Sequence, residues 1–162
     1  MFDRTLRSIM ERKKLVTATP QMTVREAAKL MASRNVGAIM VLGESGKLAG
    51  IFTERDAVFR VIAKGLDFKT TLLEQVMTPS PITMGPHYSY GHALVVMQEN
   101  GFRHVPVVDE NDTPIGIVSS RNAMDPDLEE FVFEERRRKF HSVVNDRRRV
   151  NAGPLLRRAT ND

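Results

Sequence analysis

The chain contains the same seven-residue pattern twice. Residues 50–56 read Gly-Ile-Phe-Thr-Glu-Arg-Asp and residues 116–122 read Gly-Ile-Val-Ser-Ser-Arg-Asn, a separation of 116 − 50 = 66 residues. The same separation relates further positions: Thr17 and Thr83, Ala27 and Ala93, Met31 and Met97. Two copies are fewer than the roughly three that an open repeat array needs. The repeat therefore predicts two copies of one small α/β unit that share a core.

Hydrophobic periodicity predicts the order of elements in each copy. Apolar residues at 24, 27, 28 and 31 have helical spacing, and Thr23 with Glu26 matches a capping box at the helix start. In the first copy we expect strands at 36–42 and 48–52, a turn at 44–46 and a second helix over about 54–64. The second copy should have strands at 81–84, 105–108 and 115–118 and a helix at 90–99. A last helix should begin either near Asn122 or at Asp125-Pro126. The predicted fold is α/β (α+β), built from two β-α-β-β-α units.

The repeat also predicts how the chain is divided. We expect the first repeat at residues 1–66, the second at 67–124, and a C-terminal helix with a basic, frayed tail at 125–162. The formal net charge is +4, and the excess of bases lies in residues 136–158. A run of like charges is either a solvated surface or a contact for an anionic partner such as nucleic acid or an acidic protein. Both interpretations of the tail fit the residues.

Several classes of protein are disfavoured by composition. The chain has no cysteine, which excludes disulfides, thiolate catalysis and cysteine-based zinc sites. No segment approaches the roughly 18 apolar residues of a membrane span, so we expect a cytoplasmic protein. The four histidines form no His-Glu-x-x-His signature, and no Gly-x-Ser-x-Gly motif is present. We therefore expect no catalytic residues, no metal site, no catalytic cofactor and no enzyme activity.

The repeated pattern places a polar pair at a helix start. Thr53 can cap the helix that follows strand 48–52, and its free N–H groups can alternatively meet an anion such as phosphate. Asp56 offers two acceptor oxygens at the same place, which suits a cis-diol such as ribose. A Thr-x-x-Asp pattern also describes a helix that only caps itself. From the residues alone, ligand binding and self-capping fit equally well.

Taken in order, these motifs resemble a tandem pair of cystathionine-β-synthase (CBS) domains, called a Bateman module. The resemblance covers residues 6–122 and rests on four motifs: the Ala-x-x-x-Met helix stripe, the Val-Pro-Val-Val-Asp strand at 105–109, Val76-Met77-Thr78 and the Gly-x-x-Thr-x-x-Asp pattern. It implies two repeats about a pseudo-two-fold axis with two clefts for adenosine-containing ligands such as AMP, ADP, ATP, NAD or S-adenosylmethionine. It also implies a homodimer whose conformation reports binding to an effector protein, without catalysis.

Carrying the family's site over to this sequence gives two unequal clefts. The first would use Thr17, Ala18, Val36, Gly37, Ala38, Thr53, Arg55 and Asp56. The second would use Ile82, Thr83, Arg103, His104, Val105, Pro106, Ser119, Arg121 and Asn122. Asn122 replaces the carboxylate of Asp56 by a neutral amide, and charge-assisted hydrogen bonds are roughly twice as strong as neutral ones. Arg103 and His104 stand where the first copy has Gly37 and Ala38, a position at which basic residues face phosphates in related nucleotide-binding members.

One alternative belongs to a different functional class. The chain would then be a non-catalytic, dimeric adaptor whose basic tail at 136–158 binds nucleic acid or an acidic protein, while Thr53 and Asp56 only cap a helix. Steep weakening of that binding by salt would distinguish it from a nucleotide sensor.

Overall fold

The computed structural model describes residues 2–10 and 15–123, which belong to one compact unit ending at Ala123. The helix and basic tail predicted beyond residue 124 lie outside the described residues. Among the residues described, no helix combines the length and the apolar run needed to cross a bilayer.

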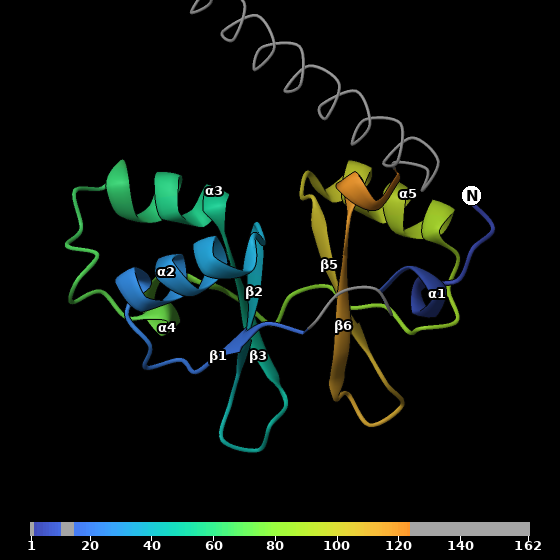
Figure 1. Cartoon of the computed structure of the whole chain (residues 1–162), viewed down its shortest axis with the longest axis horizontal. Coiled ribbons are helices and arrows are strands. Elements are labelled where there is room, and N and C mark those ends of the chain that lie inside the picture. Colours follow the sequence, from blue (N-terminus) through green and yellow to red (C-terminus); the bar gives the residue numbers. More distant parts are fainter. Residues whose placement is uncertain (1, 11–14, 124–162) are drawn as a thin grey trace, which may run out of the picture. The chain divides into compact units, whose positions relative to one another are not determined.

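A four-stranded sheet has the order β1-β2-β3-β4, in which the first repeat supplies β1 to β3 and the second supplies β4. β1 pairs in parallel with β2, and the β2-β3 and β3-β4 pairs are antiparallel. The strands are β1 (Thr17–Ala18), β2 (Ala38–Leu42), β3 (Leu48–Thr53) and β4 (Thr78–Pro79). Figure 1 shows the helices of the first repeat gathered beside one end of the sheet, away from the β2-β3 hairpin turn.

The helices of the first repeat begin at the predicted caps. α2 (Val24–Arg34) starts at Thr23, whose Oγ1 accepts a hydrogen bond from the N–H of Glu26 at 3.3 Å, while the N–H of Thr23 donates to the Glu26 carboxylate at 2.9 Å. α3 (Glu54–Asp56) is one turn long and continues as the π-helix η1 (Ala57–Ile62). In η1 the N–H of Ala63 reaches the carbonyl of Val58, five residues back, instead of the four of the α-helix that the sequence predicted.

The second repeat has the same order of elements. α5 (Tyr90–Asn100) precedes the antiparallel pair β5 (His104–Val108) and β6 (Pro114–Ser119), and the 3-10 helix η2 (Ser120–Ala123) follows. The strand predicted at 81–84 is wrong, because only an isolated bridge from Met84 to Val107 forms there. Pro81 has no N–H to donate, so no ladder can begin through a hydrogen bond at this residue.

Two short helices are exchanged between the repeats. α1 (Leu6–Met10) belongs to the first repeat in sequence but packs against β6 of the second, and α4 (Leu73–Val76) belongs to the second repeat in sequence but packs against β3 of the first. Figure 1 shows α1 beside α5 and β6, and α4 below α2. Each repeat is thus completed by a helix that comes from the other repeat's side of the sequence.

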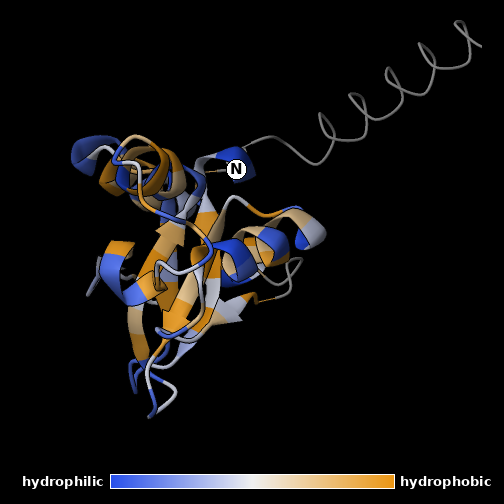
Figure 2. Cartoon of the chain, turned by 90° about the vertical axis from the view of Figure 1, so that its left-hand side faces the viewer, coloured by the Kyte–Doolittle hydropathy of each residue, from blue (hydrophilic) through white to orange (hydrophobic). Residues whose placement is uncertain are grey.

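The exchange gives two hydrophobic cores of similar composition. One contains Leu6, Ile9 and Met10 of α1 with buried residues of the second repeat, among them Tyr90, Val105 and Val118. The other contains Leu73 and Val76 of α4 with buried residues of the first repeat, among them Ile39, Val41 and Phe52. Figure 2 shows hydrophobic residues concentrated along the strands.

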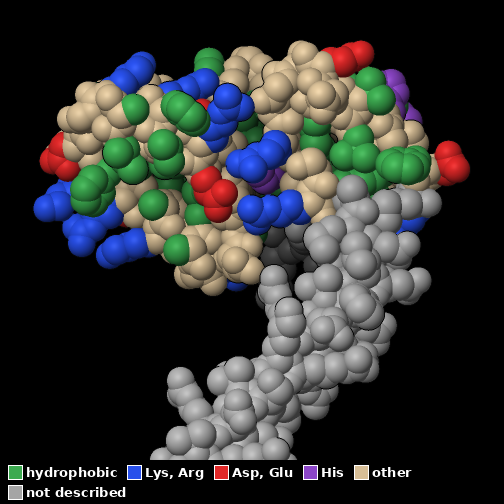
Figure 3. Space-filling view, turned by 90° about the horizontal axis from the view of Figure 1, so that it is seen from above, with side chains coloured by type: hydrophobic (Ala, Val, Ile, Leu, Met, Phe, Trp, Pro, Cys, Tyr) green, Lys and Arg blue, Asp and Glu red, His purple; other side chains and the backbone are tan. Residues whose placement is uncertain are grey.

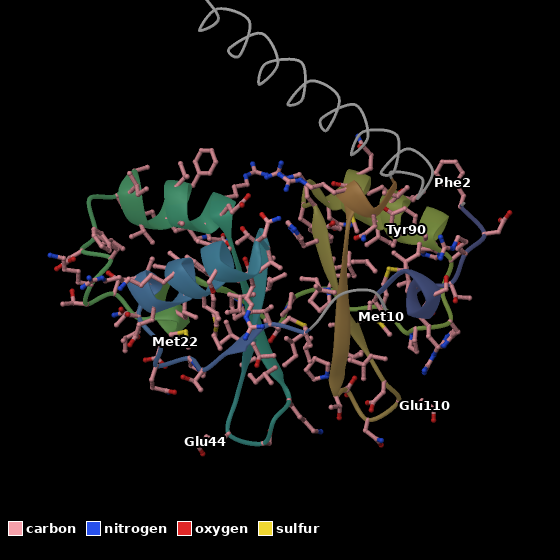
Figure 4. All side chains as sticks on the ribbon, viewed as in Figure 1. Phe2, Met10, Met22, Glu44, Tyr90 and Glu110 are labelled. Carbon is pink, nitrogen blue, oxygen red and sulfur yellow. The ribbon has the colours of Figure 1, made fainter. Side chains whose placement is uncertain are left out.

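Gly50 and Gly116 have equivalent roles at the two exchanged contacts. A Cβ built on Gly50 would lie 2.9 Å from the carbonyl oxygen of Thr78 and against the sulfur of Met77. A Cβ built on Gly116 would meet Met10 of α1, which Figure 4 shows beside β6. The glycine of the repeated pattern therefore allows close packing of a segment from the other repeat, residues 77–78 at Gly50 and Met10 at Gly116.

Candidate functional site

A cavity of about 560 Å³ lies between the two repeats. One wall is formed by the end of β3 together with α3 and η1, another by the segment after β4, and a third by the end of α5 and the start of β5. The polar and charged residues in its lining include Thr53, Arg55, Asp56, Arg60, Arg103 and His104. Figure 3 shows several Lys or Arg side chains and a histidine gathered at the middle of this face.

Thr53 and Asp56 form a reciprocal capping box at the base of this cavity. The N–H and Oγ1 of Thr53 both donate to Oδ2 of Asp56, at 2.9 and 2.7 Å, and the N–H of Asp56 donates back to Oγ1 of Thr53 at 3.3 Å. The self-capping interpretation of Thr-x-x-Asp is thus confirmed. It does not exclude a ligand, because each carboxylate oxygen can accept more than one hydrogen bond.

The second oxygen of Asp56 is held by Arg60. Nε of Arg60 lies 3.2 Å from Oδ1 of Asp56, and Nη1 of Arg60 donates to the carbonyl of Val76 at 3.0 Å. Asp56 is only 8% exposed, and a buried carboxylate requires such partners. Arg60 therefore connects the carboxylate to the end of α4, just before the segment that forms the opposite wall of the cavity.

Arg55 lines the cavity and contacts the second repeat. Its Nη1 donates to the carbonyl of Gly101 in the second repeat at 3.0 Å, and its guanidinium carbon lies 5.4 Å from the centre of the Phe59 ring. Gly101 ends α5 in the left-handed conformation, with φ of 70°, which leaves this carbonyl group at the helix end. The side chain thus joins the two repeats in the lining of the cavity.

The second repeat keeps the capping geometry without the charge. The N–H and Oγ of Ser119 donate to Oδ1 of Asn122 at 2.8 and 3.0 Å. The amide therefore replaces the carboxylate in the box. This equivalence shows that the local fold of the repeated pattern needs an acceptor oxygen at its last position and not a negative charge.

The cavity unites residues that the sequence analysis had assigned to two different clefts. Of the first set, Gly37, Thr53, Arg55 and Asp56 line it; of the second set, Ile82, Arg103 and His104 line it as well. The lining of this cavity therefore does not follow the grouping by copy, and the assignment of ligand-binding residues to two clefts stays a prediction. The reason is the arrangement of the repeats, which brings the end of β3 opposite the start of β5, so that one copy's helix start faces the other copy's strand start.

The remaining predicted residues do not line this cavity. Ala18, Ala38, Val105 and Pro106 are buried, Thr17 lies on β1, and Thr83 is exposed. Val36 and Arg121 line a neighbouring hollow of about 310 Å³, and Ser119 and Arg121 line a third of about 30 Å³ together with Arg103 and His104. Asn122 contacts Ser119 in the second capping box.

The sequence analysis missed Phe59, Arg60 and the wall at residues 78–81. Arg60 follows Asp56 by four residues, a spacing that indicates a helical ion pair and would have identified it. No local signal marks residues 78–81, because they reach the cavity through the pairing of β4 with β3. Within residues 2–10 and 15–123, no group of three or more His, Asp or Glu side chains is arranged to hold a metal ion.

Comparison with known proteins gives a consistent picture. The CBS domain model matches residues 6–63 and 73–126. The CBS domain-containing protein YhcV of Bacillus subtilis is 39% identical over 105 residues, which are 65% of this chain and 73% of that protein.

Solved structures show the same fold. An uncharacterised conserved protein from Pyrococcus horikoshii has a TM-score of 0.69 and 30% identity over 75% of this chain and 90% of its own. The CBS domain pair of protein MJ0100, crystallised with 5′-methylthioadenosine and S-adenosyl-L-methionine, has a TM-score of 0.64 and 31% identity over 74% of this chain and 91% of its own. The chain therefore belongs to the CBS domain family and contains two CBS domains.

Proposed function

We propose that this chain is a regulatory module that binds an adenosine-containing ligand in the cavity between its two CBS domains. The observation that carries the proposal is the cavity of about 560 Å³ with a buried carboxylate, that of Asp56, at its base. Pockets for small ligands typically measure about 300–1,000 Å³. The similarity to the MJ0100 pair, which was crystallised with adenosine derivatives, supports the choice of ligand class.

The chemistry of the cavity suits a nucleoside. Asp56 presents oxygens that can accept from ribose hydroxyls, and Thr53 lies beside it at the helix start. Ile82, Pro81 and Phe102 provide apolar surface on the facing walls for a base. A ligand bound in this way contacts both repeats. Its binding therefore favours the conformation in which the two repeats lie close enough to contact it together.

Transmission of binding would proceed through a homodimer. Val58 and Ile62 on η1 are 50% and 70% exposed, although both are large and apolar. Exposed apolar surface next to a ligand site is suited to contact with a second protein surface. Because η1 continues directly from α3, which carries Asp56, a change at the ligand would reach this surface without passing through a flexible segment.

The test is a binding panel with AMP, ADP, ATP, NAD and S-adenosylmethionine, measured by calorimetry and thermal shift. Ligand at about 100 times its dissociation constant should stabilise the protein by roughly 2.7 kcal/mol. Asp56→Asn should fold, because Asn122 already accepts the equivalent hydrogen bonds from the N–H and Oγ of Ser119 in the second repeat. It should also lose preference for ATP over 2′,3′-dideoxy-ATP, because the charged acceptor for the hydroxyls is gone.

Asp112→Asn is the matched control. Asp112 is exposed in the hairpin between β5 and β6 with φ of 59°, a conformation that asparagine adopts readily. It removes the same charge far from the cavity and should leave binding unchanged. The proposal fails if no member of the panel binds. It also fails if Asp56→Asn prefers ATP over 2′,3′-dideoxy-ATP as strongly as the unaltered protein does.

A further inference from the structure

One carboxylate oxygen of Asp56 is already committed to the fold. Oδ2 accepts a hydrogen bond from the N–H of Thr53 at 2.9 Å and another from Oγ1 of Thr53 at 2.7 Å. A carboxylate has about four lone-pair sites on its two oxygens, so these two hydrogen bonds use the capacity of Oδ2. A ligand hydroxyl that donates to Asp56 must therefore reach Oδ1, the oxygen that the capping box leaves open.

Oδ1 of Asp56 already has a partner, which is Arg60. Nε of Arg60 lies 3.2 Å from Oδ1, and both residues line the cavity between the repeats. The second repeat has no such pair in its sequence, because the residues 66 positions later are Asn122 and Pro126. Its capping box nevertheless forms, from Ser119 and Asn122. The cation of Arg60 is therefore not needed to build the helix start that carries Asp56.

The contact between Arg60 and Asp56 can be given up at small cost. The side chain of Arg60 is 39% exposed, so water can solvate the guanidinium when it leaves Oδ1. Nη1 of Arg60 also donates to the carbonyl of Val76 at 3.0 Å, a second contact that does not depend on Asp56. Exposed ion pairs contribute little to stability, whereas hydrogen bonds to charged groups are among the stronger ones. A hydroxyl that reaches Oδ1 can therefore replace Arg60 there.

We propose that Arg60 competes with the sugar of the ligand for Oδ1 of Asp56, and thereby limits what the second of two neighbouring hydroxyls adds to binding. One hydroxyl uses the lone pair of Oδ1 that Arg60 leaves free, and Arg60 stays in place. A second hydroxyl on the same oxygen displaces Nε of Arg60, so its hydrogen bond is partly offset by the lost ion pair. This inference rests on the proposed adenosine site and makes Arg60 a residue that sets sugar specificity through Asp56.

The experiment compares AMP with 2′-deoxy-AMP by calorimetry. The two ligands share base and phosphate, so the ratio of their affinities reports the second hydroxyl alone. Arg60→Met keeps a long side chain and removes the competitor. We expect it to raise the preference for AMP over 2′-deoxy-AMP by at least about twofold, the effect expected when an i,i+4 ion pair is no longer lost on binding. Arg60→Met added to Asp56→Asn should leave the ratio unchanged, because no carboxylate remains to compete for.

A second measurement uses the unaltered protein and stays decisive even if Arg60→Met folds poorly. The Nε–H of Arg60 can be observed by NMR in the complexes with AMP and with 2′-deoxy-AMP. We expect this proton to exchange with water faster in the AMP complex, because only the ligand with both hydroxyls displaces Nε from Oδ1 of Asp56. A residue that merely stabilised the fold would give the same exchange rate in both complexes.

Arg25→Met is the matched control, because Arg25 is exposed on α2 and lines none of the hollows described above. It should leave the ratio of affinities unchanged. This inference is overturned if Arg60→Met gives the same ratio as Arg25→Met, if Nε–H exchange is equally fast in both complexes, or if AMP does not bind. The adenosine site survives each of these results and is overturned only if no member of the whole ligand panel binds.

Discussion

The exchange of α1 between the repeats makes a direct prediction for Leu6→Ala. Leu6 is 0% exposed and packs with the core of the second repeat, so truncation removes buried contacts and leaves a cavity. Such a change costs about 2–5 kcal/mol. With a urea m-value of about 2 kcal/mol/M, the unfolding midpoint should fall by roughly 1–2.5 M.

The prediction also specifies which repeat the substitution perturbs. In methyl NMR spectra, Leu6→Ala should shift the resonances of Val105 and Val118 in the second repeat and leave Ile39 and Val41 in the first repeat nearly unchanged. Leu73→Ala is the matched variant, because Leu73 is equally buried and belongs to the other core.

The matched variant should give the opposite pattern, with shifts in the first repeat. Two outcomes would refute the exchange of helices. One is that Leu6→Ala disturbs the first repeat more than the second. The other is that it costs less than about 1 kcal/mol, which a fully buried leucine does not allow.

Two further predictions concern Gly50 and Asp109. Gly50→Ala should cost about 1–3 kcal/mol in urea unfolding and weaken nucleotide binding, because the new Cβ would lie 2.9 Å from the Thr78 carbonyl oxygen and force a wall of the cavity to move. Backbone N–H groups of Thr113 and then Asn111 lower the pKa of Asp109 below 3.8, so its contribution to stability is present above that pH and is lost as the pH falls through the lower folded value. Urea titrations at neutral pH and well below 3.8 should therefore show a smaller loss of stability for Asp109→Asn than for the unaltered protein.

The Gly50 prediction has a matched control variant, and both predictions have an outcome that would contradict them. Gly43→Ala adds the same methyl group where the nearest atoms are 3.9 Å away, so it should be nearly neutral; a Gly50→Ala variant as stable as Gly43→Ala would contradict the close-packing explanation. For Asp109, an identical loss of stability on acidification with and without the carboxylate would show that its hydrogen bonds are not coupled to folding.

The sequence was sufficient for the features that depend on neighbouring residues. The capping box at Thr23 and Glu26 marked the start of α2 correctly, because the residues that stabilise a helix start lie within one turn of each other. The hairpins were also anticipated, including the turn at Gly46, which has φ of 72°. Alternation and turn residues are local properties, so a single copy contains the information for them.

The exchange of helices and the composition of the cavity depend on distant pairings. Nothing near Leu6 indicates that its partners begin at Met84, and nothing near Thr78 indicates that it pairs with Ile51. The 66-residue separation identified the equivalent residues of the two repeats. It did not indicate which residues of one repeat lie close to which residues of the other. Arg103 was therefore recognised as a basic residue of interest, while its position opposite Asp56 required the tertiary structure.

The exchanged helix α1 has a consequence for synthesis on the ribosome. Met10 packs against Gly116, and 116 − 10 gives a separation of 106 positions along the chain. At about 5–20 residues per second, some 5–20 s pass between the synthesis of α1 and that of its partners in β6. A five-residue helix is not stable by itself in water, so α1 must wait in an unfolded form during that time. α1 is thus made well before it can pack, and its apolar residues are available to chaperones until the second repeat has been translated.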